Sequence, residues 1–271
     1  MKAENQYQAV PKVPELVSMS ALAPESRLEA LTTPGSFAAE QFRALAARLH
    51  HLAERRTLKT ILVTSDSFQE GKTLICLNLA VTLARRSARK ILLIEADLRK
   101  PALMSTLGVQ PLPGLSDWVQ GNQPLVNFTH QLAGLNLWTL PAGAPCEHPL
   151  EIVQSPRMRD LIDEVREQFD WVVVDSAPLL VTDANILSRL VDGTLIVARQ
   201  EYTRRKRLQQ SMKGIENPLG FVLNDASAAD PGGYHHYYSP AKINGNGNGH
   251  RHPPVKQEPH FEVIPPRAQA S

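Results

Sequence analysis

Short apolar segments alternate with longer helical segments along most of this 271-residue chain, and this alternation constrains the fold more than any other feature. The strand candidates are residues 60–64, 91–94, 135–140, 171–174, 194–198 and 221–223. Several of them are apolar at every position, as expected for parallel strands that are buried on both faces. Strand, crossover and strand repeated in this way predict an α/β fold with a doubly wound, mostly parallel sheet. Ligands of such folds bind at the carboxyl ends of the strands.

The two ends of the chain differ in composition from its middle. Residues 1–36 contain many Pro, Ser and Glu residues with little periodicity, so we predict a disordered leader. Residues 37–54 carry apolar side chains at helical spacing and predict an amphipathic helix before the first strand. Residues 226–271 are rich in Gly, Pro, Asn and His, which predicts a disordered tail. The nucleotide-binding domain is then expected to span 37–225.

Charge and cysteine content exclude several classes of protein. A formal net charge of +2 gives no electrostatic basis for binding nucleic acid. The basic clusters at 85–90 and 204–207 are interpreted as solvated helix faces. With two cysteines, neither a disulfide framework nor a metal knuckle is expected. No apolar run has the length of a signal peptide or membrane span, so we expect a cytoplasmic protein that reaches a membrane only through a partner.

One strand-to-helix loop has the pattern of a phosphate-binding loop. Residues 61–80 read ILVTSDSFQEGKTLICLNLA, so an apolar strand leads through a polar loop into Gly-Lys-Thr and an apolar helix. In such loops the backbone N–H groups at the helix N-terminus face the phosphates, the lysine reaches the terminal phosphates and the hydroxyl ligates Mg²⁺. The predicted nucleotide contacts are Ser67, Phe68, Gln69, Glu70, Gly71, Lys72, Thr73 and Leu74.

The loop departs from the usual fingerprint at its start. Asp66 occupies the position of the first glycine, and Gln69 and Glu70 leave no further glycine before Gly71. Carboxylates this close to a bound phosphate would repel it unless their side chains turn outward. By itself, a Gly-Lys-Thr sequence is weak support for a nucleotide site.

Carboxylates at the ends of two other strands strengthen the prediction. Glu95 and Asp97 follow the strand in ILLIEADLRKP, and Asp175 ends the strand in FDWVVVDSAP. A Mg²⁺·ATP site needs oxygen ligands, or carboxylates that hold water, opposite the loop hydroxyl. We therefore predict Lys72, Glu95, Asp97 and Asp175 as catalytic residues. The expected Mg²⁺ ligands, direct or through water, are Thr73, Asp97 and Asp175.

With these motifs in order, the chain resembles the bacterial tyrosine kinases (BY-kinases) of capsule and exopolysaccharide synthesis. The resemblance covers about residues 36 to 240 and includes EGKTLICLNLA, ILLIEADLRKP, the long stretch that ends in WVVVDSAP, TDA, GTLIVAR and GFVLND. It implies an ATP-dependent protein-tyrosine autokinase with three Walker motifs. Lys72 and Thr73 would contact phosphate and Mg²⁺. Glu95 and Asp97 would form the second Walker motif, and Asp175 the Walker B carboxylate.

The resemblance also implies an acceptor and partners. Members of this family carry a C-terminal tyrosine cluster that is phosphorylated in trans, and the matching segment here is GGYHHYYSP with Tyr234, Tyr237 and Tyr238. The implied partners are a membrane polysaccharide co-polymerase subunit as activator, a cognate tyrosine phosphatase and further copies of the chain. In the family's subunit-contact motif, Glu40 and Arg43 match but Ala46 replaces the last arginine, which weakens the prediction of a homo-oligomer.

Two alternative functions remain open from the sequence. Glu95 stands where the family has aspartate, and a carboxylate misplaced by about 1 Å in a catalytic centre can cost on the order of 100-fold in rate. A non-catalytic ATP-binding regulator of the co-polymerase is therefore one alternative. The other is a P-loop ATPase of the partition or division-site type, although Ser67 occupies the place of the signature lysine of those proteins.

Overall fold

The computed structural model describes residues 28–86, 89–226 and 260–264. The helices are α1 (Glu29–Thr32), α2 (Phe37–Ala53), α3 (Lys72–Arg86), α4 (Leu103–Thr106), α5 (Leu115–Gln120), α6 (Pro149–Gln154), α7 (Pro156–Gln168), α8 (Thr182–Ser188) and α9 (Arg205–Ser211), with 3-10 turns at Leu125–Asn127 and Met212–Gly214. The strands are β1 (Thr60–Ser65), β2 (Ile91–Glu95), β3 (His130–Gln131), β4 (Leu137–Leu140), β5 (Trp171–Asp175), β6 (Gly193–Arg199), β7 (Pro218–Ala226) and β8 (His260–Ile264).

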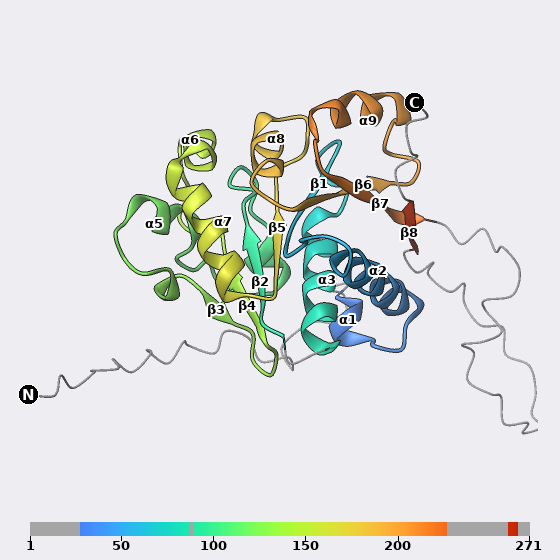
Figure 1. The fold of residues 1–271 in the computed structure, drawn as a ribbon, viewed down its shortest axis with the longest axis horizontal. Helices are drawn as coiled ribbons and strands as arrows, with labels where there is room; N and C mark the ends of the chain where they lie inside the picture. Colours follow the sequence, from blue (N-terminus) through green and yellow to red (C-terminus); the bar gives the residue numbers. More distant parts are fainter. Residues whose placement is uncertain (1–27, 87–88, 227–259, 265–271) are drawn as a thin grey trace, which may run out of the picture.

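These strands form one twisted sheet with helices on both faces (Figure 1). The strand order is β3-β4-β2-β5-β1-β6-β7-β8. The pairs from β4 to β7 are parallel, and β3 and β8 add antiparallel edges. The predicted doubly wound, mostly parallel sheet is confirmed. All the predicted strands are present, with boundaries shifted by a few residues at most.

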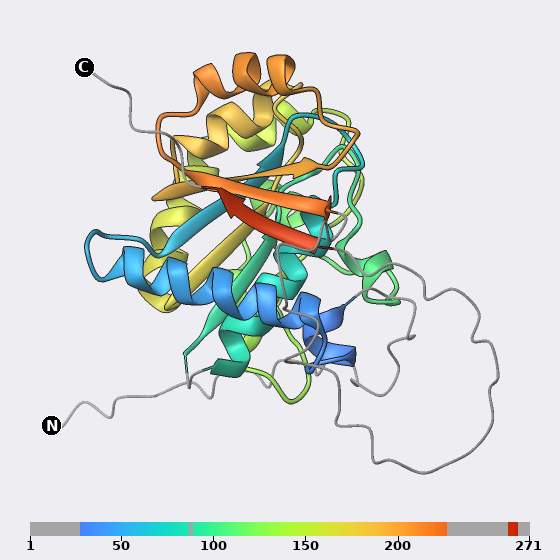
Figure 2. The ribbon, with the colours of Figure 1, turned by 90° about the vertical axis from the view of Figure 1, so that its right-hand side faces the viewer.

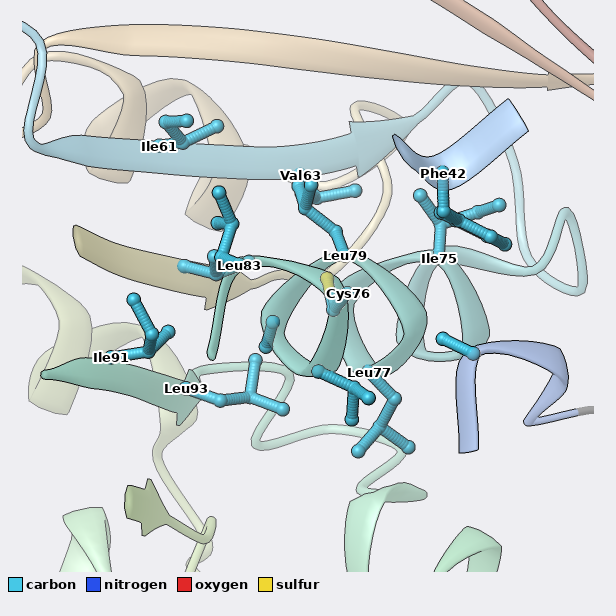
Figure 3. Packing of buried hydrophobic residues seen from close by; sticks show 14 of the residues in the cluster. Phe42, Ile61, Val63, Ile75, Cys76, Leu77, Leu79, Leu83, Ile91 and Leu93 are labelled. Carbon is cyan, nitrogen blue, oxygen red and sulfur yellow. The ribbon is translucent and has the colours of Figure 1, made fainter. Parts of the chain in front are cut away.

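Alternate side chains of the central strands supply two separate cores, as the period of two in a strand requires. On one face, Ile61 and Val63 of β1 and Ile91 and Leu93 of β2 pack against α3 and Phe42 of α2 (Figure 3). On the other face, the intervening residues of the same strands pack against α5, α7 and α8. The central strands are therefore buried on both faces of the sheet, which explains why they are apolar throughout.

The helix predicted at 37–54 is α2, and its N-cap is Ser36, whose hydroxyl accepts a hydrogen bond from the Ala39 backbone N–H at 3.1 Å. Ala46 is fully buried on the core side of α2. The Ala46 side chain therefore packs in the chain's own core, and the matching motif residues Glu40 and Arg43 lie on the more exposed side of α2. Arg43 forms an ion pair with Glu40 and donates to the Pro34 carbonyl at 2.7 Å.

Described residues lie outside both ends of the predicted 37–225 domain. Leu28 and Ala30 are buried, and the Ala30 backbone N–H donates to the Asn78 side chain at 2.9 Å, so the last part of the 1–36 leader packs on α3. At the other end, β8 pairs antiparallel with β7 within the predicted 226–271 tail (Figure 2). The remaining leader and tail residues lie outside the described part of the chain.

Within the described residues, no helix is long and apolar enough to cross a membrane.

Candidate active site

The phosphate loop lies between β1 and α3, at the carboxyl edge of the sheet. Its turn depends on two residues with positive φ, Gln69 at 60° and Gly71 at 92°. The first α-helical hydrogen bond of α3 joins the Ile75 N–H to the Gly71 carbonyl at 3.0 Å. The backbone N–H groups of Lys72, Thr73 and Leu74 precede this bond and have no partner inside the helix. They form the anion-binding end of α3.

Gly71 is needed for space as well as for its backbone conformation. The Asn224 amide nitrogen at the end of β7 donates a hydrogen bond to the Glu70 carbonyl at 2.9 Å. A Cβ atom at position 71 would overlap this same amide group. The last parallel strand therefore packs directly on the loop, and a side chain at position 71 would push the two apart.

The first residues of the loop are held by short-range contacts. The Ser65 hydroxyl donates to the Ser67 carbonyl at 2.6 Å, and the Ser67 N–H donates to Glu70 at 3.0 Å. Phe68 is half-buried, and the Lys100 ammonium lies 4.5 Å from the centre of its ring. Leu74 packs against the core, so that only its backbone can face a phosphate. These contacts fix the first residues of the loop relative to one another.

Asp175 is the most unusual group in the site. It ends β5, is fully buried, and neither carboxylate oxygen has a hydrogen-bond partner among the described residues. Burial raises the pKa of this carboxyl to about 7, an effect that the neighbouring Thr73 hydroxyl and Lys72 ammonium partly oppose. The Thr73 hydroxyl thus lies near Asp175 without the geometry of a hydrogen bond. A buried carboxylate without partners, beside a hydroxyl, fits the oxygen ligands that Mg²⁺ prefers.

Asp97 lies in the loop that follows β2, where it is buried beside the same lysine. Desolvation raises the pKa of this carboxyl, whereas a hydrogen bond from the Lys100 N–H, 3.1 Å long, and the Lys72 charge lower it. Lys72 is itself buried. The structure therefore brings Lys72, Thr73, Asp97 and Asp175 close to one another at the carboxyl edge of the sheet.

Glu95 is placed differently from the other carboxylates. One of its oxygens accepts hydrogen bonds from the Ala102 and Leu103 N–H groups, each at 2.6 Å. The other oxygen accepts from the Ala142 N–H at 3.0 Å. Burial raises the pKa of Glu95 despite these three bonds. The side chain thus joins the start of α4 to the segment after β4. Because both carboxylate oxygens accept hydrogen bonds from backbone N–H groups, we do not expect Glu95 to act directly in catalysis.

Contacts between distant segments complete the site, and the motif pattern gave no indication of them. The Arg99 guanidinium holds the buried Asp183 carboxylate of α8 through two hydrogen bonds of 2.8 and 3.0 Å. Arg207 of α9 holds Asp66, and Thr203 holds Glu70. Asp183 lies in the TDA segment and Asn224 in GFVLND, both part of the resemblance, and Arg207 lies in the basic cluster at 204–207, but no sequence pattern indicates that Thr203, Arg207 or Asn224 contacts the phosphate loop. The acceptor tyrosines Tyr234, Tyr237 and Tyr238 lie outside the described residues.

One cavity among the described residues is separate from this chemistry. It has a volume of about 580 Å³ and is lined by Arg85 at the far end of α3 and by residues of the turn before β4. Since α3 begins at the phosphate loop and is 15 residues long, this cavity lies at the opposite edge of the sheet. We assign no nucleotide binding to it.

A phosphate loop at a parallel sheet edge, with strand-end carboxylates opposite its lysine and hydroxyl, defines a P-loop nucleotide-binding protein with Walker-type motifs. No family model matches the sequence. The chain is 31% identical over 222 residues to the tyrosine-protein kinase wzc of Salmonella typhi, covering 79% of this chain and 31% of that relative. It is 28% identical to the tyrosine-protein kinase YwqD of Bacillus subtilis, covering 76% of this chain and 90% of YwqD.

Among solved structures, the kinase domain of the Escherichia coli tyrosine kinase ETK has the same fold. It superposes with a TM-score of 0.70 at 28% identity, covering 82% of this chain and 93% of that domain. The chain belongs to the bacterial tyrosine kinase family. It spans about a third of the length of the curated relatives it matches first, and most of the length of YwqD.

Proposed function

We propose that this protein is an ATP-dependent protein-tyrosine autokinase that phosphorylates the tail cluster Tyr234, Tyr237 and Tyr238 of neighbouring copies. The observation that carries the proposal is the buried, unpartnered Asp175 carboxylate beside Thr73 and Lys72. Buried carboxylates without hydrogen-bond partners are uncommon in proteins, and a bound cation would explain this one. Mg²⁺ held by Thr73 and Asp175, with Asp97 through water, would be that ligand.

The site residues have distinct roles in the proposed reaction. Lys72 and the backbone N–H groups of the loop bind the β- and γ-phosphates and stabilise the charge that spreads over them. Mg²⁺, when bound, neutralises the β- and γ-oxygens. Asp97 orients the tyrosine hydroxyl and takes its proton while the tyrosine oxygen bonds to the γ-phosphorus and the bond to ADP breaks. We assign this role to Asp97 alone, because Glu95 is bound by three backbone amides.

The names of the relatives support the kinase over a partition-type ATPase, and we extend them to the cellular role. We infer that the kinase acts in capsular or exopolysaccharide synthesis. It would work at the inner face of the plasma membrane through a membrane co-polymerase subunit as activator, with a cognate phosphatase that resets the tail. Homo-oligomer formation would supply the neighbouring copy.

The experiment that tests this proposal is phosphopeptide mass spectrometry after incubation with Mg²⁺·ATP. We expect phosphate on the peptide with Tyr234, Tyr237 and Tyr238, and none in Lys72→Ala. Lys90→Ala removes an exposed lysine before β2 and serves as the matched control with unchanged labelling. Equal labelling of the wild type and Lys72→Ala would show that this loop does not carry the activity.

A further inference from the structure

The phosphate loop of this chain contains an electrostatic conflict. A loop that binds phosphates carries two buried carboxylates, Asp66 and Glu70, at positions close to the bound polyanion. Each negative charge would repel the nucleotide if it were unpaired in a poorly solvated loop. The arrangement of these carboxylates therefore decides how well the loop can bind a nucleotide.

Asp66 is paired by α9. One of its oxygens lies 2.5 Å from the Arg207 Nε, and the other accepts a hydrogen bond from the Ser211 hydroxyl at 2.8 Å. The Asp66 side chain is 1% exposed and the Arg207 side chain 44% exposed. The ion pair therefore joins the buried Asp66 carboxylate at the start of the loop to the partly exposed Arg207 guanidinium. None of the side chains of α9 is buried, so this helix contributes polar contacts to the loop and no core packing.

Glu70 is held from the same direction. One of its oxygens accepts a hydrogen bond from the Ser67 N–H, and the other from the Thr203 hydroxyl. That hydroxyl in turn accepts from the Arg199 N–H at 2.7 Å. Both carboxylates are thus turned toward residues 199–211, which connect β6 to the end of α9.

We propose that residues 199–211 act as a bracket that shapes and neutralises the phosphate loop, with Arg207 as the positioning residue for nucleotide binding. The usual phosphate loop has glycines where this chain has Asp66, Gln69 and Glu70. Here side-chain contacts from the bracket fix the loop from outside, and the backbone N–H groups of the loop stay directed to the phosphates. Arg207 does not touch the nucleotide; it keeps the Asp66 charge compensated. This inference rests on the nucleotide binding that the proposed function requires.

The bracket predicts a specific pattern in a double-mutant cycle. Arg207→Ala leaves the buried Asp66 charge uncompensated, so we expect the Kd for Mg²⁺·ADP to rise about tenfold. Asp66→Asn removes the charge, and its Kd should stay within about threefold of the wild type. The double variant should match Asp66→Asn, because Arg207 then has no charge to compensate. A role of Arg207 in stability alone would leave the double variant as weak as Arg207→Ala.

The experiment is calorimetric titration of the full chain with Mg²⁺·ADP, which requires no phosphoryl transfer. Arg205→Ala is the matched control, since Arg205 lies in the same helix, is exposed, and has no hydrogen bond or ion pair with the described residues. Its Kd should equal that of the wild type. Thermal melting of each variant shows which of them are folded at the titration temperature.

The outcomes separate the inference from the proposed function. If the wild type binds Mg²⁺·ADP and Arg207→Ala binds it equally well, the bracket is wrong and the kinase proposal stands. If the wild type does not bind, or Lys72→Ala binds as tightly, both proposals fail. If Arg207→Ala does not fold, Arg207→Lys replaces it in the cycle. We expect that variant to retain the charge and bind within about threefold of the wild type, and a tenfold loss there would overturn the electrostatic role.

Discussion

At the scale of single residues, Glu95 differs from the other motif carboxylates because three backbone N–H groups bind its side chain. It stands where the family has aspartate, and the longer side chain spans the distance to the N–H groups of Ala102, Leu103 and Ala142. These three groups come from two segments that are remote from each other in the sequence. No local pattern could therefore reveal that Glu95 joins them.

This arrangement predicts that restoring the family residue does harm. Glu95→Asp shortens the side chain by one methylene, so the three buried N–H groups lose good geometry and the free energy of unfolding should fall by about 1–3 kcal/mol. Urea denaturation measures this change. Asp163→Glu, at an exposed position of α7, is a control that changes the length of a carboxylate without burial. A more stable or more active Glu95→Asp protein would show that the backbone contacts matter little.

The raised pKa of Asp175 predicts a pH dependence with a definite sign. In the unfolded chain this carboxyl loses its proton near 3.8, and in the fold it does so near 7. Between these values the folded state binds the extra proton, so the stability of the nucleotide-free protein falls as the pH rises through this window. At pH 8, Asp175→Asn should be more stable by on the order of 2 kcal/mol.

Nucleotide binding should show the opposite trend, because Mg²⁺ needs the charged carboxylate. We expect the affinity for Mg²⁺·ADP to increase from pH 6 to pH 8 in the wild type and to be low and nearly constant in Asp175→Asn. Melting and titration across this range test both trends. An Asp175→Asn variant that is less stable at pH 8, and still binds with the same pH profile, would contradict the assignment of Asp175.

At the scale of elements, the loop between β1 and α3 contains a strained backbone conformation at Gln69, and the bracket contacts this loop. Gln69 adopts φ of 60°, a left-handed conformation that costs a residue with a Cβ roughly 1–2 kcal/mol. Gln69→Gly should therefore stabilise the protein by roughly 0.5–1 kcal/mol, net of the greater entropy of glycine in the unfolded chain. Gln41→Gly, within α2, is the control and should destabilise by about 1 kcal/mol. A loss of stability in Gln69→Gly would mean that the contacts of the Gln69 side chain stabilise the fold by more than its backbone strain destabilises it.

The same scale shows which elements the sequence could predict. The central strands and α2 follow from local patterns, because each is a continuous apolar or amphipathic segment with its own period. The bracket could not be predicted, since Asp66 and Arg207 are brought together only by the order of β1 and β6 in the sheet. For the same reason, the solvated face expected at 204–207 includes a residue that holds the phosphate loop.

At the scale of the whole molecule, two short segments outside the predicted 37–225 domain contact its core or the edge of its sheet. Leu28 is buried although it lies in a Pro-rich and Ser-rich segment, because α2 and α3 leave an apolar surface that one aliphatic side chain can fill. β8 joins the sheet because the edge of β7 offers unpaired backbone groups, a requirement that composition does not reflect. Both additions depend on the completed core, so they could not be read from their own sequences.

The central claim is that this phosphate site transfers phosphate to the tyrosine cluster of another copy. A mixing experiment tests it most directly: the Lys72→Ala chain with an intact tail is incubated with Mg²⁺·ATP and a chain that has Lys72 but carries Phe at 234, 237 and 238. Intact-mass and phosphopeptide analysis then report which chain is labelled. We predict phosphate on the tail of the Lys72→Ala chain in the mixture and none when that chain is incubated alone. An unlabelled Lys72→Ala tail in the mixture, while the wild type labels itself, would contradict transfer between copies.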